Sequence, residues 1–463
     1  MAQLLYSFYA SNGTKISEAT VFSSPAAASV QVLADERENA KLGLAIANDS
    51  DQTVTYTVTI TGAGVLGNGS ITLGPRSASA QFVDDVVPSV PPGVLGQVLV
   101  SSSTGKASII GLRFTGGVFT SIPQTLAGSI GATSFTDHVF PEIADGKFAD
   151  GSYFRTTRIY SNPIPTAGTS CVTLFHGMTS GGQSVFISGL GPGTFAALPT
   201  AGTQSLQSGY AEMQCSLPVD AAALYSFYSA SGVKLSEATV FSSQPGRILQ
   251  VLSDSREGAQ VGLAIANNTD QPNTYMITVY DAGGAVVGTA SLNLPARSSI
   301  ARFVNEFVPL PPNHYGPVIV SGTGAANIIG LRFTGSTFTT IPGSVLLAAP
   351  ANSPPPVTLT RAYTTDTNNV VQNTFTAGQQ VRLALDVNNS LSASAAISAY
   401  YGVISATFVG SFGSTGSSVP AGVNTIYFDL TIPQTNPGMY SITGFVISQG
   451  AISSQSATFT VTK

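Results

Sequence analysis

The sequence predicts an all-β protein made of tandem antiparallel β-sandwich domains of the immunoglobulin-like kind, arranged as an elongated array. Short runs of alternating apolar and polar residues, bounded by Gly, Asn, Asp and Pro, recur along the whole chain, and no segment keeps a helical period. One long passage occurs twice, as LYSFYASNGTKISEATVFSS (residues 5–24) and LYSFYSASGVKLSEATVFSS (residues 224–243). The two copies are about 220 residues apart, too far for a solenoid turn, so a domain or a domain pair is duplicated.

The individual elements follow from local signals. Asn12-Gly13 predicts the turn of an N-terminal β-hairpin. The alternating runs TYTVTIT (55–61) and TYMITV (274–279) predict equivalent strands in the two copies. FVDDVV (82–87) and FVNEFV (303–308) predict single helical turns, also at equivalent places.

Alignment of the copies gives the domain boundaries. We expect a first sandwich repeat, a middle sandwich, a second copy of the repeat, a Pro-rich linker that is extended and semi-rigid, and a C-terminal immunoglobulin-like sandwich. These parts span residues 1–126 (with the hairpin at 1–24), 133–243 (with a closing hairpin at 224–243), 244–347, 348–356 and 357–463.

The place of the hairpin in this scheme stays open. It closes the sandwich before it, or it packs on the repeat that follows it. In the first case the hairpin at 1–24 has no preceding sandwich and its strand edges are unpaired. Such edges are templates for strand addition from another chain.

Composition excludes several classes of function. Charged residues make up 9% of the chain, against about 25% in an ordinary soluble domain. With 18 Lys plus Arg and no basic run, the chain offers no footprint for a phosphate backbone, so no nucleic acid partner is expected. No apolar stretch approaches the roughly 18 residues of a transmembrane helix. The neutral surface, rich in Ser and Thr, is typical of an extracellular or cell-surface protein, although no leader is visible.

The two cysteines, Cys171 and Cys215, are predicted to form a disulfide between neighbouring strands, which fits an oxidising compartment. Two buried free thiols are the alternative. Without a nearby His they make no zinc site.

Other polar positions favour structural explanations. Asp35, Arg37 and Glu38 recur in the second copy and indicate a solvated turn with a local ion pair. The runs 48–51, 267–270, 145–146 and 150–151 are typical of turns and lack the spacing of a calcium loop. Arg113 and Arg332, within the two GLRF phrases, are expected on the solvent face of a strand.

The repeated phrases resemble modules of large secreted bacterial surface proteins. In those, one sandwich begins with FPxIADG and ends in EAxVxxS, and a second carries GLALAN and LGLRF…FTxxP. The matching stretches here are 140–146, 236–243, 262–267, 330–333 and 338–342, with first-copy equivalents at 43–48, 111–114 and 119–123. The resemblance implies that SEATVFSS closes the FPEIADG module, so that the first hairpin lacks its usual partner. PGMYSI (437–442) is similar to a bacterial immunoglobulin-like domain with a tyrosine corner at Tyr440.

Together these observations predict a non-catalytic extracellular structural protein: a self-assembling surface or filament subunit, or an adhesive stalk. No G-x-S-x-G phrase, cofactor motif or metal motif is present, and His138, His176 and His314 are scattered. The expected partners are other copies or other surface proteins. The candidate assembly residues are Leu5, Tyr6, Phe8, Tyr9, Val21 and Phe22. Deleting residues 1–24 is expected to abolish assembly and to leave the other sandwiches folded.

The alternative is an array of glycan- or ligand-binding modules. Tyr6, Tyr9, Tyr225 and Tyr228 would then form a small aromatic platform, although the absence of Trp weakens this hypothesis. Such an array would be monomeric.

Overall fold

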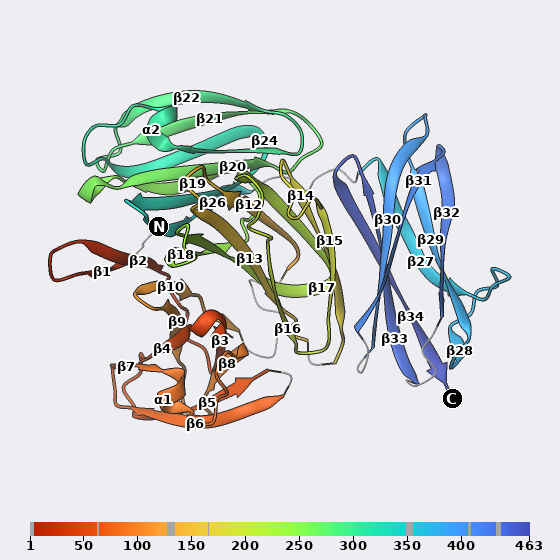
Figure 1. Ribbon diagram of the computed structural model, residues 1–463, viewed down its shortest axis with the longest axis horizontal. Coiled ribbons are helices and arrows are strands. Elements are labelled where there is room, and N and C mark those ends of the chain that lie inside the picture. Colours follow the sequence, from red (N-terminus) through yellow and green to blue (C-terminus); the bar gives the residue numbers. More distant parts are fainter. Residues whose placement is uncertain are drawn as a thin grey trace.

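A computed structural model of the protein describes residues 4–62, 64–126, 135–164, 166–348, 355–405, 409–431 and 437–463. Almost all regular structure in these ranges is antiparallel β-sheet, arranged as several sandwiches (Figure 1). The predicted fold class is confirmed. Most of the predicted linker at 348–356 lies outside the described residues.

The first repeat is a sandwich of two sheets, with strand orders β10-β9-β4-β7 and β11-β3-β8-β5-β6. Its elements are β3 Ser29–Asp35, β4 Lys41–Asn48, β5 Val54–Thr61, β6 Val65–Leu73, β7 Ser77–Phe82, α1 Val83–Val86, β8 Leu95–Ser101, β9 Ser108–Thr115, β10 Val118–Ile122 and β11 Thr125–Leu126. Alternating side chains such as Tyr56, Val58 and Ile60 point into the space between the sheets and are fully buried.

The second copy of the repeat has the same plan, but one long strand belongs to both of its sheets. Its elements are β19 Gly246–Asp254, β20 Gln260–Asn267, β21 Asn273–Tyr280, β22 Val286–Leu294, β23 Ser298–Phe303, α2 Val304–Phe307, β24 Tyr315–Thr334, β25 Thr337–Pro342 and β26 Ser344–Ala348. The helices α1 and α2 confirm the predicted single turns. Two one-turn 3₁₀ helices, Arg37–Asn39 and Arg256–Gly258, also occupy equivalent places.

The middle sandwich depends on one long strand, β17. Its elements are β12 Phe135–Lys147, β13 Tyr153–Ser161, β14 Thr169–His176, β15 Val185–Leu190, β16 Phe195–Pro199, β17 Gln207–Tyr228 and β18 Lys234–Phe241. The first part of β17 pairs with β12 and β14, and its last part pairs with β13 and β18. The duplicated hairpin in the second copy is therefore continuous with the sheet of the middle sandwich.

The hairpin at the start of the chain has no such continuation. It consists of β1 Leu4–Tyr9 and β2 Lys15–Val21, which form a two-stranded sheet of their own. Gly13 in its turn has a φ of 82°, a left-handed conformation that glycine adopts without steric strain, and Gly232 repeats it at 83°. Asn12-Gly13 thus lies at the turn, as predicted.

The C-terminal sandwich packs against the middle one. It contains a three-stranded sheet and a five-stranded sheet around its own core. Its elements are β27 Val357–Thr365, β28 Thr374–Thr376, β29 Gln380–Asn389, β30 Ala395–Ser405, β31 Val409–Val419, β32 Gly422–Thr431, β33 Gly438–Ser448 and β34 Ala451–Thr462. Val172 and Leu174 of β14 share an apolar cluster with Phe445 and Ile447 of β33.

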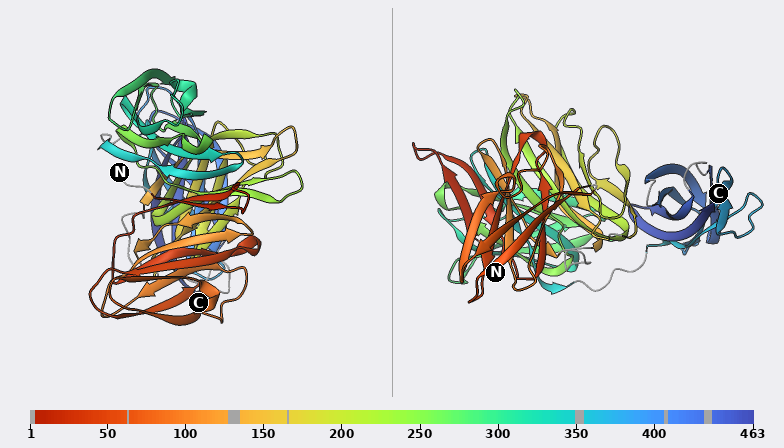
Figure 2. Two further views of the ribbon diagram at one scale, coloured as in Figure 1. Left: turned by 90° about the vertical axis from the view of Figure 1, so that its left-hand side faces the viewer. Right: turned by 90° about the horizontal axis from the view of Figure 1, so that it is seen from below.

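The first and second repeats do not follow each other in a line. They lie on opposite sides of the two hairpins, with the middle sandwich beside them and the C-terminal sandwich at the far end (Figures 1 and 2). Figure 2 shows that the N-terminal hairpin lies between the two repeats, next to a chain segment more than 200 residues away. This position brings both hairpins into one site.

Candidate functional site

Each of the two hairpins bridges the two repeats. The second strand of each hairpin, β2 or β18, contacts both β10 of the first repeat and β25 of the second. The backbone N–H of Thr20 donates to Thr339 Oγ1 at 2.9 Å, and the N–H of Thr239 donates to Thr120 Oγ1 at 2.8 Å. Each contact of one copy is thus repeated by its counterpart, which is the pattern of an approximate two-fold axis.

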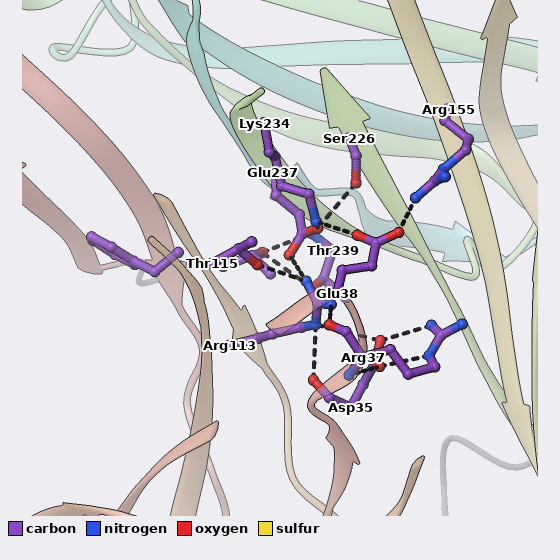
Figure 3. Close-up of polar contacts among 12 residues, drawn as sticks. Asp35, Arg37, Glu38, Arg113, Thr115, Arg155, Ser226, Lys234, Glu237 and Thr239 are labelled. Atoms are coloured by element: carbon purple, nitrogen blue, oxygen red, sulfur yellow. Dashed lines mark hydrogen bonds and ion pairs between the residues drawn. The ribbon is translucent and has the colours of Figure 1, made fainter. Parts of the chain in front are cut away.

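Two buried ion pairs lie where the hairpins meet the two repeats. Arg332 Nη1 donates to Glu18 Oε1 at 2.6 Å. Figure 3 shows the equivalent pair, in which Arg113 Nη1 donates to Glu237 Oε1 at 2.5 Å. All four side chains are at most 2% exposed. We call these four residues the hairpin clasp. In each pair the glutamate comes from the hairpin of one copy and the arginine from the sandwich of the other.

Each clasp arginine is held by further acceptors. Arg113 donates from Nε to the carbonyl oxygen of Asp35 at 2.9 Å and from Nη2 to that of Arg37 at 2.7 Å. Arg332 makes the same two bonds to Asp254 and Arg256, at 3.1 and 2.8 Å. A buried charge is tolerated only when it is paired and hydrogen-bonded, and both arginines meet that condition.

The prediction that these arginines lie on the solvent face of their strands is wrong. Along β9 the fully buried positions are Ile109, Gly111 and Arg113, whereas Leu112 and Phe114 on the other face are only partly buried. Leu112 and Phe114 share one face of the strand, so alternation favoured that face for the core, but tertiary contacts bury the face of Arg113 more completely. The available signal was the recurrence of one Arg and one Glu at the same positions of both copies.

Lysines and a second pair of glutamates extend the clasp to the surface. Lys15 donates to Glu18 at 2.5 Å and to Glu257 at 3.0 Å. In the other copy Lys234 donates to Glu237 and, at 2.9 Å, to Glu38. Glu38 and Glu257 have left-handed backbones, with φ of 60° and 61°, a conformation that residues other than glycine rarely adopt.

The turn that holds Glu38 is more than the solvated local ion pair that was expected. Asp35 does pair with Arg37 at 2.7 Å, but Asp35 is buried, and Glu38 reaches Lys234 and Arg155 from distant parts of the chain. Burial raises the pKa of Glu38, but the charges of Lys234 and Arg155 outweigh burial and hold that pKa at about 2. The glutamate is therefore ionised at neutral pH.

Four of the predicted assembly residues lie on β1; of the other two, Val21 ends β2 and Phe22 directly follows it. The side chains of Tyr6, Phe8 and Tyr9 are 53%, 49% and 43% exposed, and Leu5 is partly buried. Val21 and Phe22 are also partly buried. The ring of Phe22 meets that of its counterpart Phe241 edge to face, with centroids 4.8 Å apart.

The outer edges of the two hairpins differ. The edge of β17 pairs with β13 over nine residues, from Tyr153 opposite Tyr228 to Ser161 opposite Asp220. Within the described parts of the chain, β1 pairs only with β2. The first hairpin therefore presents an open strand edge next to exposed aromatic side chains.

Cys171 and Cys215 face each other in the adjacent strands β14 and β17 and form a disulfide, with Cα atoms 4.0 Å apart. The bond lies in a small cluster of buried side chains that includes Tyr160 and Met213. Sequence and structure therefore agree on this pairing.

The runs 48–51, 267–270 and 150–151 lie at turns or strand ends, as predicted, whereas Asp145 and Gly146 lie within β12 and the prediction of a turn there is wrong. The Asn48 side chain donates to the carbonyl oxygens of Gln52 and Gly74, each at 2.8 Å. Arg76 pairs with both Asp49 and Asp51, so a side chain of the same sandwich already binds these carboxylates. In the middle sandwich, Asp145 accepts from Thr200 and Gly202, and Asp150 accepts from Ser152.

The three histidines lie apart. His138 Nε2 is 3.0 Å from the carbonyl oxygen of Val219, His176 stacks on Tyr210, and His314 is buried in the second repeat. Across the described ranges, no group of three or more His, Cys, Asp or Glu is arranged to hold a metal ion. Nor does any helix in those ranges have the length and apolar character needed to span a membrane.

Comparisons with known proteins do not add a functional assignment. No family model and no curated protein matches the chain. Similar solved structures include the Pseudomonas fluorescens alkylpurine DNA glycosylase AlkC bound to DNA containing an abasic site analog (TM-score 0.18, 18% identity). They also include the C-terminal domain of wzt (TM-score 0.19, 16% identity) and a Bacteroides uniformis beta-glucuronidase (TM-score 0.19, 8% identity).

The similarity to these structures is partial. The matches cover 23%, 23% and 51% of this chain, and 31%, 74% and 26% of the respective other chains. The chain thus spans less than a third of the DNA glycosylase and about a quarter of the beta-glucuronidase. With TM-scores this low, the similarity says nothing about activity.

Proposed function

We propose that this protein is a non-catalytic structural component of an extracellular surface, a subunit that joins an assembly or filament through its N-terminal hairpin. The observation that carries the proposal is the open edge of β1, because the duplicate of this edge in β17 is covered by a strand. Unpaired edges with exposed aromatic side chains are sites of strand addition. Tyr6, Phe8 and Tyr9 lie at this edge.

The rest of the chain is suited to that role. With charged residues at 9% of the sequence, little like-charge repulsion opposes close approach of neighbouring molecules. The disulfide between Cys171 and Cys215 is compatible with an extracellular location. The clasp joins Glu18 and Arg332, which are 314 residues apart, and so holds the two repeats together in one body.

Deleting the whole N-terminal hairpin is not a clean test of this proposal. Deleting residues 1–24 would remove Glu18 and leave Arg332 buried without its carboxylate partner, so the expectation that the other sandwiches stay intact no longer holds. A substitution on the exposed side of β1 avoids this problem. Phe8→Lys places a charge on the open edge, as natural proteins do to block edge pairing.

Assembly is measured by light scattering across a range of concentrations and by negative-stain electron microscopy. Wild-type protein is expected to form regular oligomers or filaments, and Phe8→Lys is expected to stay monomeric. Met439→Lys, at a 70% exposed residue of the C-terminal sandwich, is the matched control and should assemble normally. Monomers of the wild type at every concentration, or normal assembly of Phe8→Lys, would contradict the proposal and favour the array of ligand-binding modules.

A further inference from the structure

Because the hairpin is duplicated, the second copy shows which side chains would cover the open edge of β1. In the second copy, β13 covers the equivalent edge of β17 with three consecutive side chains, Tyr153, Phe154 and Arg155. Tyr153 stacks on Tyr228 with ring centroids 4.8 Å apart and planes 8° from parallel. Phe154 packs against Phe227 at 4.8 Å, also between centroids.

Arg155 supplies the positive charge that β13 places against the second hairpin and Glu38. Its Nη2 donates to Glu38 Oε1 and, at 2.8 Å, to the hydroxyl oxygen of Tyr228. Its guanidinium also lies 5.1 Å from the centre of the Tyr228 ring. A cation held by a carboxylate and an aromatic face at once is a specific recognition element.

The first copy retains the groups that would receive such a strand. Tyr9 and Glu257 correspond to Tyr228 and Glu38, and their hydrogen bond is kept: Tyr9 donates to Glu257 Oε2 at 3.1 Å, and Tyr228 donates to Glu38 Oε2 at 3.2 Å. Glu257 also keeps the left-handed backbone. Its side chain, however, is 61% exposed, against 39% for Glu38.

The aromatic receiving groups are likewise uncovered. Tyr6 is 53% exposed, whereas its counterpart Tyr225 is 5% exposed beneath Phe154 and Phe338. Tyr9 is 43% exposed and Tyr228 is 6% exposed. Each tyrosine is buried in the second copy, where β13 pairs with β17, and its counterpart on β1 is exposed.

The open region continues from the strand edge onto the sheet beside it. In the second repeat, Ile329 and Leu331 of β24 are buried in one apolar cluster with Phe140 and Ile143 of the middle sandwich. The equivalent Ile110 and Leu112 of β9 are only partly buried. The uncovered surface of the first copy is therefore larger than one strand edge.

We propose that the first copy is the docking site for a β-sandwich module of another polypeptide, which adds an antiparallel strand of the pattern aromatic–aromatic–Arg to β1. In the expected register the first aromatic residue lies opposite Tyr9, the second opposite Phe8, and the arginine opposite Ser7, from where it reaches Glu257. The β13 strand of a second copy is not the donor, because it is already paired on both sides, with β16 and β17. This inference rests on the proposed function and names the class of partner at the same site.

The first test uses a labelled peptide with the sequence of β13, Tyr153–Ser161, and full-length protein at a concentration where it is monomeric. Fluorescence anisotropy should show saturable binding. Glu257→Gln in the protein, or alanine in place of the third residue of the peptide, should each weaken binding about tenfold, because each removes the charge-assisted bond. Glu38→Gln is the matched control and should leave the affinity unchanged, since Arg155 already occupies that carboxylate.

The second test raises the local peptide concentration, because a free nine-residue strand loses much entropy on binding. The same nine residues are joined to the N-terminus of the full chain by a flexible linker, which gives effective concentrations in the millimolar range. Hydrogen exchange of the β1 amides should slow to the rate seen in the last part of β17. A fusion with alanine at its first three positions, in place of Tyr153, Phe154 and Arg155, should give no such protection.

The possible outcomes separate this inference from the proposed function. Peptide binding that depends on Glu257, together with protection of β1 in the fusion, supports the inference whether or not the protein forms filaments. Unprotected β1 amides in the fusion, or binding that Glu257→Gln does not change, would overturn it. Filaments that form through β1 in pure protein while β1 rejects this peptide would keep the proposed function and replace the partner by a second copy.

Discussion

Arg332 of the second repeat and Glu18 of the N-terminal hairpin are 314 residues apart in sequence, and their side chains form an ion pair 2.6 Å long with both partners 2% exposed. Arg113 and Glu237 form the equivalent pair with the roles of the two copies reversed. These two reciprocal ion pairs join the two repeats into one body, and the stability of the N-terminal hairpin should depend on them.

Removing one partner of a clasp pair should destabilise the protein strongly. Arg332→Met and Glu18→Gln are each expected to lower the free energy of unfolding by about 3–5 kcal/mol, because each leaves an uncompensated buried group. The double variant should lose less than the sum of the two. Urea unfolding, with hydrogen exchange of β2, measures both effects.

A surface arginine provides the control for that experiment. Arg76 pairs with Asp49 and Asp51, but its side chain is 57% exposed. Arg76→Met should therefore change stability by no more than about 1 kcal/mol. Equal effects of Arg332→Met and Arg76→Met would show that the clasp contributes no more than a surface ion pair.

The contact between the second hairpin, residues 224–243, and the first repeat should weaken in acid. The pKa of Glu38 is lowered from 4.5 to about 2, so its stabilising contribution is present above pH 4.5 and is lost as the pH falls towards 2. Melting temperatures of wild type and Glu38→Gln should therefore converge across this interval. If the difference between them is the same at pH 6 and pH 2, the ionised form of Glu38 is not what stabilises this contact.

Glu142 should show the opposite pH dependence. It is buried on β12 beside a cavity of about 180 Å³ at the boundary with the second repeat, and burial raises its pKa well above 4.5. A raised carboxyl pKa favours folding below pH 4.5, and this contribution is lost as the pH rises, by about 1.4 kcal/mol for each pKa unit.

Glu142→Gln removes this ionisable group and keeps its size. The variant is expected to gain stability relative to wild type between pH 5 and pH 8, as measured by melting temperature at both values. A constant difference across that interval would contradict a buried, protonated carboxyl group.

Loss of the disulfide should destabilise the middle sandwich. The bond closes a loop between residues 44 positions apart, and removing such a bond costs about 2–4 kcal/mol. Cys171→Ala combined with Cys215→Ala, or reduction of the wild type, should lower the melting temperature without preventing the first repeat from folding. Far- and near-ultraviolet circular dichroism with and without reductant tests this, and an unchanged melting temperature would show that packing alone holds β14 and β17 together.

Local sequence signals predicted local structure well. Asn12-Gly13 lies in the first hairpin turn, and α1 and α2 lie where equivalent single turns were expected. The chain itself holds the information for these elements, because a turn depends on a few adjacent residues and a strand on a period of two.

The candidate site was predicted only in part. The open edge was one of two alternatives, and the pairing of β13 with β17 decided between them. Arg113 was placed on the wrong face, because Leu112 and Phe114 share one face of the strand, and the burial of the other face depends on Glu237 from a distant part of the chain. Glu18, its counterpart Glu237 and Arg155 were not singled out, since nothing near them in sequence indicates a partner more than 100 residues away.

The sequence by itself determined the all-β fold, the duplication and the positions of the turns, because alternation and turn chemistry act over a few residues. Only the tertiary structure decided that each hairpin bridges the two repeats, that two arginines are buried, and that one hairpin edge is covered while its duplicate is open. The physical reason is that burial and strand pairing depend on which distant segments meet. Two nearly identical sequences, at residues 5–24 and 224–243, therefore have different surroundings, because β13 pairs with the second of them whereas β1, among the described residues, pairs only with β2.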